Sequence, residues 1–217
     1  MADPIRLLIA DDHRIVREGL KQMLAEAPDI QVCAEVSTGD AVVPEVRRCH
    51  ALGPIDLVML DIAMPGVDGL DVLQNLRSEF PDLPVLMLSM YPERHYAVRC
   101  IKLGASGYLN KSADPDDMLG AIRKVASGER FLTASTADAL ARHVGGRGHG
   151  GDTESLSHRE YQVFRLLTTG HSVSEIGARL SLAPNTVSTY RARILEKTNT
   201  KNDVELTLYA ERQGRSA

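Results

Sequence analysis

The chain has 217 residues and a net charge of −4, and 43% of its residues are hydrophobic but only 4% aromatic. This length suits one large or two small domains, and no run approaches the roughly 18 apolar residues of a membrane span. The cysteines, Cys33, Cys49 and Cys100, fit neither a disulfide framework nor a Cys-x-x-Cys metal site. Residues 1–4 lack the basic flank and apolar core of an export signal, so we expect a cytoplasmic protein.

The first half of the chain alternates short β-rich runs with helical patterns. The runs predict strands at residues 5–10, 30–36, 55–60, 84–88 and 107–109. The apolar spacing predicts helices at residues 15–24, 41–51, 69–79 and 93–102. Asp114 as N-cap and Pro115 at the first helical position mark a fifth helix. Strict alternation predicts an α/β fold, a doubly wound five-stranded parallel sheet with helices on both faces.

A glycine-rich segment then divides the chain. Residues 143–152 contain five glycines and no apolar periodicity, which is typical of a linker, and a helix at 134–143 leads into them. We predict a first domain at 4–128, a linker with a helix and the glycine-rich segment at 129–152, and a second domain at 153–217.

The second domain shows no strand pattern, only four short helices. The Ser-x-x-Glu spacing of a capping box starts two of them, at Ser157 and Ser172, while Pro184 and Asn202 open the others. A unit of about 60 residues is small for an enzyme pocket. We therefore predict a small all-α binding module, and a protein that is not an enzyme.

Polar side chains follow four strands of the predicted sheet. Asp11 and Asp12 come directly after the first strand, Asp61 ends the third, Ser89 ends the fourth, and Lys111 follows the fifth. The carboxyl ends of parallel strands form one crevice, so these side chains should meet. Three carboxylates there would repel one another unless they share a cation, and Mg²⁺ suits carboxylate and phosphate oxygens. One carboxylate could then act as a nucleophile toward a phosphoryl group.

Each residue alone has a simpler explanation: Asp12 as a helix cap, Lys111 as a surface charge, Ser89 as a turn residue. Their joint placement favours a site, and three sequence blocks support it. The blocks are Ala10-Asp-Asp-His13, Met59-Leu-Asp-Ile-Ala-Met-Pro-Gly-Val-Asp-Gly69 and Gly104-Ala-Ser-Gly-Tyr-Leu-Asn-Lys111. Together they resemble the signature of flavodoxin-like receiver domains, over about residues 5–127.

That resemblance implies a role for each residue of the crevice. Asp61 would accept the phosphoryl group from a sensor histidine kinase. The metal ligands would be Asp12, Asp61, the backbone carbonyl of Ala63 and, through water, Asp11. Lys111 would pair with the phosphoryl oxygens, Ser89 would hydrogen-bond to them, and Tyr108 would rotate inward as the serine hydroxyl moves.

The helix that opens at Pro184 has a polar outward face. Val187, Tyr190 and Ile194 are predicted to face inward, and residues 184–201 carry a local charge of +3. Ala183 is a poor residue for the N-cap of this helix. Helix, short turn and helix is a geometry that seats a second helix in the major groove, although a plain hairpin with a solvated basic face is about equally consistent with the pattern. The predicted DNA contacts are Asn185, Ser188, Thr189, Arg191, Ala192, Arg193, Lys197 and Lys201.

Four blocks support the DNA-binding interpretation: Leu156-Ser-His-Arg-Glu160, Leu166-Leu-Thr-Thr-Gly170, Glu175-Ile-Gly177 and Asn185-Thr-Val187. They resemble the LuxR-type helix-turn-helix domain over about residues 154–212. With the receiver domain, the chain resembles the NarL/FixJ class of response regulators. The resemblance implies a phosphorylation-controlled transcription regulator that binds double-stranded promoter DNA and has no membrane partner.

The last predicted helix, 203–212, carries Val204, Leu208 and Tyr209 on one stripe. The stripe could pack inward, or it could pair with a second copy across a two-fold axis, which the LuxR-type resemblance favours. A homodimer of this kind should bind an inverted repeat.

Three alternatives to this function stay open. The chain could be a phosphotransfer module whose C-terminal helices bind protein, or a DNA-binding regulator whose receiver works unphosphorylated. The α/β domain could also be a flavodoxin-like cofactor enzyme, although it lacks a glycine-rich phosphate loop.

Overall fold

The chain folds into two compact units, residues 1–140 and 141–217. The computed structural model describes residues 3–90, 93–144, 156–180 and 182–214. Most of the predicted glycine-rich linker lies outside these residues. Among the described helices, none combines the length and the apolar character that a membrane crossing requires.

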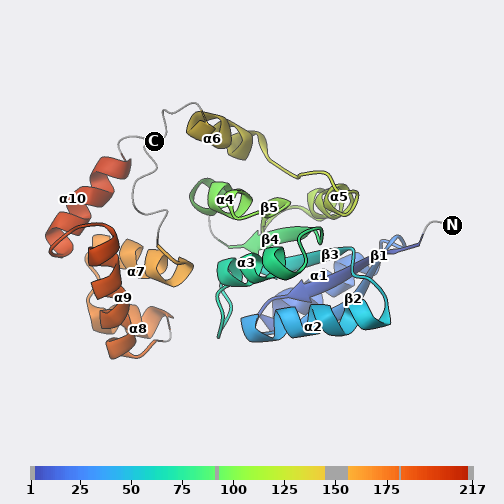
Figure 1. Ribbon diagram of the computed structural model, residues 1–217, viewed down its shortest axis with the longest axis horizontal. Helices are drawn as coiled ribbons and strands as arrows, with labels where there is room; N and C mark the ends of the chain where they lie inside the picture. The colour runs from blue at the N-terminus through green and yellow to red at the C-terminus, as the bar shows by residue number, and fades with distance from the viewer. Residues whose placement is uncertain (1–2, 91–92, 145–155, 181, 215–217) are drawn as a thin grey trace. The chain divides into compact units, whose positions relative to one another are not determined.

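The first unit is the predicted parallel sheet, with strand order β2-β1-β3-β4-β5 and helices on both faces (Figure 1). Its strands are β1 (Ile5–Ala10), β2 (Ile30–Val36), β3 (Leu57–Asp61), β4 (Val85–Ser89) and β5 (Gly107–Asn110). The central strands are buried on both faces, because β3 and β4 are apolar almost throughout. The predicted α/β fold is therefore confirmed, and strand ends differ from the prediction by two residues at most.

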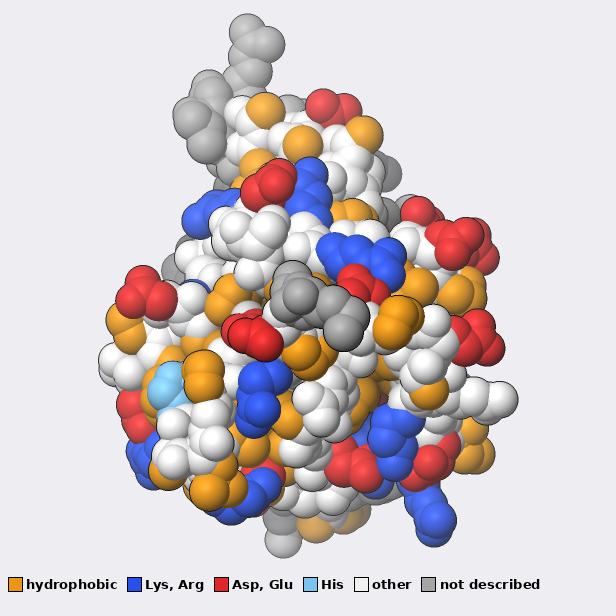
Figure 2. Space-filling view, turned by 90° about the vertical axis from the view of Figure 1, so that its right-hand side faces the viewer, with side chains coloured by type: hydrophobic (Ala, Val, Ile, Leu, Met, Phe, Trp, Pro, Cys, Tyr) orange, Lys and Arg blue, Asp and Glu red, His pale blue; other side chains and the backbone are white. Residues whose placement is uncertain are grey.

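Five helices cover this sheet. They are α1 (Arg14–Leu24), α2 (Gly39–Leu52), α3 (Gly69–Glu79), α4 (Glu93–Lys102) and α5 (Pro115–Ala126). On one face, Leu24 of α1 and Ile122 of α5 join the core cluster that contains Leu7, Ile9 and Met59 from the strands. Figure 2 shows acidic, basic and hydrophobic side chains interspersed on one face of the molecule, with no large area of a single charge sign.

The chain after α5 completes the edge of the sheet. The backbone N–H of Phe131 donates to the carbonyl of Ser106 at 2.9 Å, and Phe131 forms a parallel bridge with Gly107. A Cβ on Gly107 would lie 2.9 Å from Cδ1 of Leu86 and 3.0 Å from the Cβ of Phe131, so a larger residue here would push these neighbours aside. The sequence places Phe131 in the linker, but its side chain packs on the receiver core. The helix α6 (Ala134–Val144) follows.

The second unit is all helical. Its helices are α7 (His158–Thr168), α8 (Val173–Leu180), α9 (Pro184–Lys197) and α10 (Asp203–Gly214). Both predicted capping boxes form, since the Ser157 hydroxyl accepts from the Glu160 N–H and the Ser172 hydroxyl from the Glu175 N–H. The core includes Leu156, Phe164, Ile176, Val187, Ile194 and Leu206.

All three cysteines are free thiols. Cys49 and Cys100 are buried and Cys33 is half-buried, and burial raises the pKa of Cys100 to about 12. These thiols have the character of inert core residues.

Candidate functional site

The two innermost carboxylates lie side by side at the carboxyl edge of the sheet. β1 and β3 are neighbours with Ala10 opposite Leu60, so Asp11 and Asp61, the next residues, come together. This is the point where the strand order reverses, which is the usual place for a ligand in an open α/β sheet. Asp11 and Asp61 are 0% and 2% exposed, so both carboxylates are buried.

Lys111 joins the two carboxylates. Its backbone N–H donates to the carbonyl of Ser89, which holds the start of the β5–α5 loop against β4. The ammonium lies 2.6 Å from Oδ2 of Asp11 and 2.8 Å from Oδ2 of Asp61. A cation between two buried anions offsets their mutual repulsion, so this arrangement needs all three residues.

Burial raises the pKa of Asp61, an effect that Lys111 partly opposes and that the nearby Asp11 reinforces. The Asp61 carboxylate also accepts a hydrogen bond from the backbone N–H of Ala63 at 3.3 Å. A buried carboxylate with few hydrogen bonds retains lone pairs for a metal ion or an electrophile.

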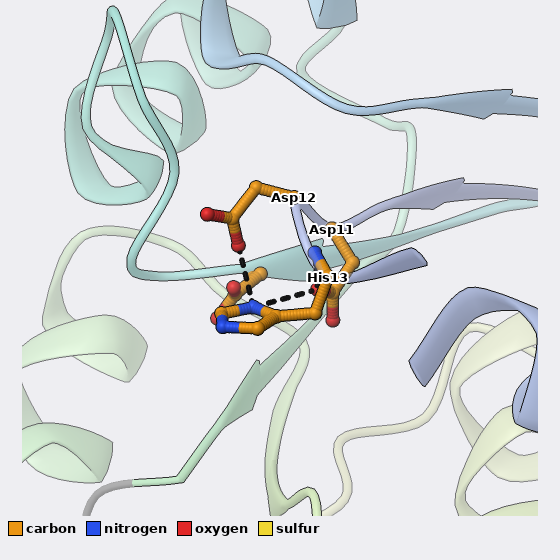
Figure 3. A group of neighbouring side chains, drawn as sticks. Asp11, Asp12 and His13 are labelled. Carbon is orange, nitrogen blue, oxygen red and sulfur yellow. Dashed lines mark hydrogen bonds and ion pairs between the residues drawn. The ribbon is translucent and has the colours of Figure 1, made fainter. Parts of the chain in front are cut away.

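Asp12 and His13 form the outer part of the site, as Figure 3 shows. Nδ1 of His13 lies 2.6 Å from Oδ1 of Asp12 and 3.4 Å from Oδ1 of Asp11. Asp11, Asp12, His13 and Asp61 each offer one ligand atom, and these atoms all lie within 4.8 Å of one another. His13 carries no predicted role, and its place beside Asp12 in the first sequence block was the available signal.

A tight loop follows Asp61 and fixes its position at the end of β3. The Asp68 carboxylate caps α3 by accepting from the Leu70 N–H at 2.7 Å, and the Gly69 N–H donates to the carbonyl of Ile62. A Cβ on Gly69 would lie 2.1 Å from the Asp61 carbonyl oxygen, so the loop closes only with glycine here.

The remaining predicted receiver residues lie on the neighbouring strands. Ser89 ends β4 and is 1% exposed, and Tyr108 lies in β5 and is 2% exposed. Tyr108 is already buried in this structure, which shows one state of the switch. Its inward rotation therefore stays a prediction. The role of the Ala63 carbonyl as a metal ligand also stays a prediction.

In the second unit, α8 and α9 form the expected helix-turn-helix. A Cβ on Gly177 would lie 2.7 Å from the carbonyl oxygen of Leu182, so a small residue in α8 permits the close turn. Val187 and Ile194 are buried and Tyr190 is half-buried, which matches their predicted inward positions.

The outward face of α9 carries five of the predicted DNA-contact residues, all exposed: Asn185, Ser188, Thr189, Ala192 and Arg193. Two other predicted contacts are engaged within the domain. Arg191 pairs with Asp203 at 2.8 Å, and Lys197 pairs with Glu160 at 2.7 Å. Lys201, in the turn before α10, is exposed.

The predicted dimerisation stripe is only partly exposed. Val204 and Leu208 are 71% and 48% exposed, whereas Tyr209 is half-buried and meets Phe164 edge-on, with ring centroids 6.4 Å apart. Tyr209 therefore packs inward, as the first of the two interpretations expected, while Val204 and Leu208 face solvent. Their pairing with a second copy stays a prediction.

This architecture, an acidic crevice on a parallel sheet followed by a helix-turn-helix unit, defines a class of two-domain regulators, and comparison with known proteins agrees. Residues 7–123 match the response regulator receiver domain, and residues 154–210 match the bacterial regulatory proteins of the luxR family. The chain belongs to the response regulators of the LuxR type, in which a receiver controls transcription through a DNA-binding domain.

Similar proteins match nearly the whole chain. Response regulator UvrY of Escherichia coli K12 is 35% identical over 97% of this chain and 95% of its own length. Response regulator GacA of Pseudomonas aeruginosa is 36% identical over 97% of both chains. A structure of the RcsB response regulator of Salmonella typhimurium, described as showing conformational dynamism for DNA interaction, is 25% identical, with a TM-score of 0.59 and coverage of 97% and 99%.

Proposed function

We propose that phosphorylation of Asp61 by a sensor histidine kinase switches this regulator between weak and tight DNA binding. The observation that carries the proposal is the Lys111 ammonium bridging the buried Asp11 and Asp61 carboxylates. Asp61 is the acceptor because it ends β3 beside Asp11 and Lys111, with its loop held by Gly69.

A divalent cation fits the acidic cluster. The four candidate ligand atoms of the cluster lie close enough to surround one ion, and three of them are carboxylate oxygens, the ligands that Mg²⁺ prefers. Asp12 and Asp61 would hold the ion directly, with the Ala63 carbonyl, and Asp11 would hold it through water. When bound, Mg²⁺ would neutralise charge on the incoming phosphoryl oxygens.

The transfer exchanges one bond to phosphorus for another. An Asp61 carboxylate oxygen forms a bond to phosphorus as the bond from phosphorus to the kinase histidine nitrogen breaks, and the electron pair returns to the imidazole. Lys111 then pairs with the phosphoryl oxygens, which draws it from Asp11. The Ser89 hydroxyl donates to the phosphoryl group, and Tyr108 responds to its movement.

The output is DNA binding by a homodimer in the cytoplasm. The exposed face of α9 would enter the major groove, where Asn185, Ser188 and Thr189 reach base edges beside Ala192, while basic side chains contact phosphates. Pairing through Val204 and Leu208 would place two such helices on an inverted repeat in promoter DNA. The names of the relatives, each a response regulator, support the regulatory role.

Intact-mass measurement tests the acceptor. The full chain, incubated with Mg²⁺ and acetyl phosphate, should gain one phosphoryl group, and Asp61→Asn should gain none. Asp71→Asn, an exposed carboxylate on α3, is the matched control and should be modified like the wild type. Phosphoryl uptake by Asp61→Asn at the wild-type rate would show that the acceptor lies elsewhere.

A further inference from the structure

Two of the basic side chains predicted to contact DNA already bind acidic side chains of neighbouring helices. Lys197, at the end of α9, reaches Glu160 of α7, and Arg191, in the middle of α9, reaches Asp203, the first residue of α10. These two pairs tie α9, which we call the recognition helix, to the helices on either side of it.

The Glu160 carboxylate cannot easily release Lys197. Its side chain is 3% exposed, and the same oxygen that accepts from Lys197 accepts from the backbone N–H of Ser157 in the capping box of α7. If Lys197 extended toward a DNA phosphate, a buried carboxylate would lose its counter-charge. The pair therefore holds the end of the recognition helix against α7.

Arg191 makes a similar link on the other side. Nε of Arg191 lies 2.8 and 3.1 Å from the two carboxylate oxygens of Asp203, and the arginine side chain is 35% exposed. The intervening turn is closed by the Thr198 hydroxyl, which donates to the Ile194 carbonyl at 2.7 Å, and by Asn199 at a φ of 51°. The pair fixes the start of α10, and thus Val204, relative to the recognition helix.

The other two basic residues are placed differently. Arg193 and Lys201 are exposed, and within the part of the chain that the structure describes neither forms an ion pair. A cation that neutralises a phosphate releases a counterion, whereas one already neutralised by a carboxylate contributes little to this release. The two kinds of cation should therefore differ in how they affect salt dependence.

We propose that Arg191 and Lys197 are positioning residues that hold the recognition helix against α10 and α7, and that Arg193 and Lys201 supply its phosphate contacts. This proposal rests on the proposed DNA-binding function, and it replaces the role that the sequence suggested for Arg191 and Lys197.

Salt titration of DNA binding separates the two roles. The full chain and four matched variants, Arg191→Gln, Arg193→Gln, Lys197→Gln and Lys201→Gln, would be titrated with a random-sequence duplex at several salt concentrations. Arg193→Gln and Lys201→Gln should each lower the slope of log affinity against log salt by about 1. Arg191→Gln and Lys197→Gln should keep the wild-type slope, lower the affinity at every salt concentration and lower the melting temperature.

An exchanged pair provides a test that does not depend on the stability of a single variant. Arg191→Asp should weaken DNA binding and lower the melting temperature, and adding Asp203→Arg should restore most of both, since the link between α9 and α10 is re-formed. If Arg191 contacted a phosphate, the exchange would leave an aspartate facing DNA and would not restore affinity.

The outcomes of the salt titration distinguish a failure of this proposal from a failure of the proposed DNA-binding function. A wild-type chain whose DNA binding is indifferent to salt would contradict the proposed DNA-binding function. If the affinity of the wild type does fall with salt, the variants decide the roles. A slope that Arg191→Gln or Lys197→Gln lowers as much as Arg193→Gln does would overturn the positioning roles of Arg191 and Lys197.

Discussion

The receiver crevice and the recognition helix both present charged side chains, but they hold them in different environments. In the crevice, Asp11, Asp61 and Lys111 are almost fully buried, and each depends on the other two for charge balance. On α9, Arg193 stands in solvent and the Arg191 pair is more than one-third exposed.

This difference indicates how each region can be altered. Buried charges cannot be removed singly without leaving an unpaired partner, so the crevice should be sensitive in stability as well as in function. Exposed charges outside the two ion pairs of α9 cost little to change, so the recognition helix can vary its contacts while capping and helix packing preserve its fold.

Removal of Lys111 should have the largest effect on stability. Lys111→Met leaves two buried carboxylates without a cation, and it should lower the free energy of unfolding of the metal-free receiver by about 3–5 kcal/mol. Urea unfolding of the full chain would measure this, with Lys21→Met, a more exposed lysine of α1, as the control that changes little. Adding Asp11→Asn should recover part of the loss, and no loss in Lys111→Met would contradict the charge balance inferred for the crevice.

Adding a methyl group at Gly69 should have the second-largest effect on stability. The added Cβ would lie 2.1 Å from the Asp61 carbonyl oxygen and 2.8 Å from the Cα of Ile62. Both are backbone atoms, which cannot move aside freely. We expect Gly69→Ala to destabilise the receiver by about 2–3 kcal/mol. Gly19→Ala is the matched control: nothing lies within 4 Å of its Cβ, so it should stabilise α1 by up to about 1 kcal/mol. Equal effects at the two sites would show that the loop is not tightly constrained.

Acid should weaken the second unit through Glu160. Burial raises the pKa of Glu160, but hydrogen bonds from Lys197 and Ser157 lower it by more, so the folded pKa lies below the ordinary 4.5. The carboxylate therefore stabilises the fold at pH values above 4.5, and this contribution is lost as the pH falls through the depressed folded pKa. Melting temperatures from pH 7 to pH 3 should show a shallower acid decline in Glu160→Gln than in the wild type. Parallel curves of melting temperature against pH for the two proteins would contradict a stabilising role of the Glu160 carboxylate.

The smallest effect should come from the start of α9. Ala183 is its N-cap and makes no side-chain cap hydrogen bond, although its backbone is extended as a cap requires. Ala183→Ser should stabilise the second unit by about 1 kcal/mol, and Ser157→Ala at the capped start of α7 should destabilise it by a similar amount. Thermal unfolding monitored by circular dichroism would measure both, and a neutral Ala183→Ser would show that water already satisfies this helix end.

Much of the fold was predictable because its signals are local. Strict β–α alternation identified the sheet, and the Ser157 and Ser172 spacings identified two helix starts whose capping boxes the structure contains. The edge contact of Phe131 was not predictable, since a single bridging residue has no strand periodicity. Asp114 stands at the N-cap of α5 as expected, but its side chain makes no cap hydrogen bond.

The sequence by itself determined the two-domain order, the family, and the placement of Asp11, Asp61 and Lys111 at or just after the carboxyl ends of strands. These depend on periodicity and spacing along the chain, which a linear pattern records. Only the tertiary structure decided the partners of the charges: that Lys111 bridges two carboxylates, and that Arg191 and Lys197 bind acids of other helices. These pairs join residues 12 to 100 positions apart, and their geometry depends on how helices and strands pack against one another.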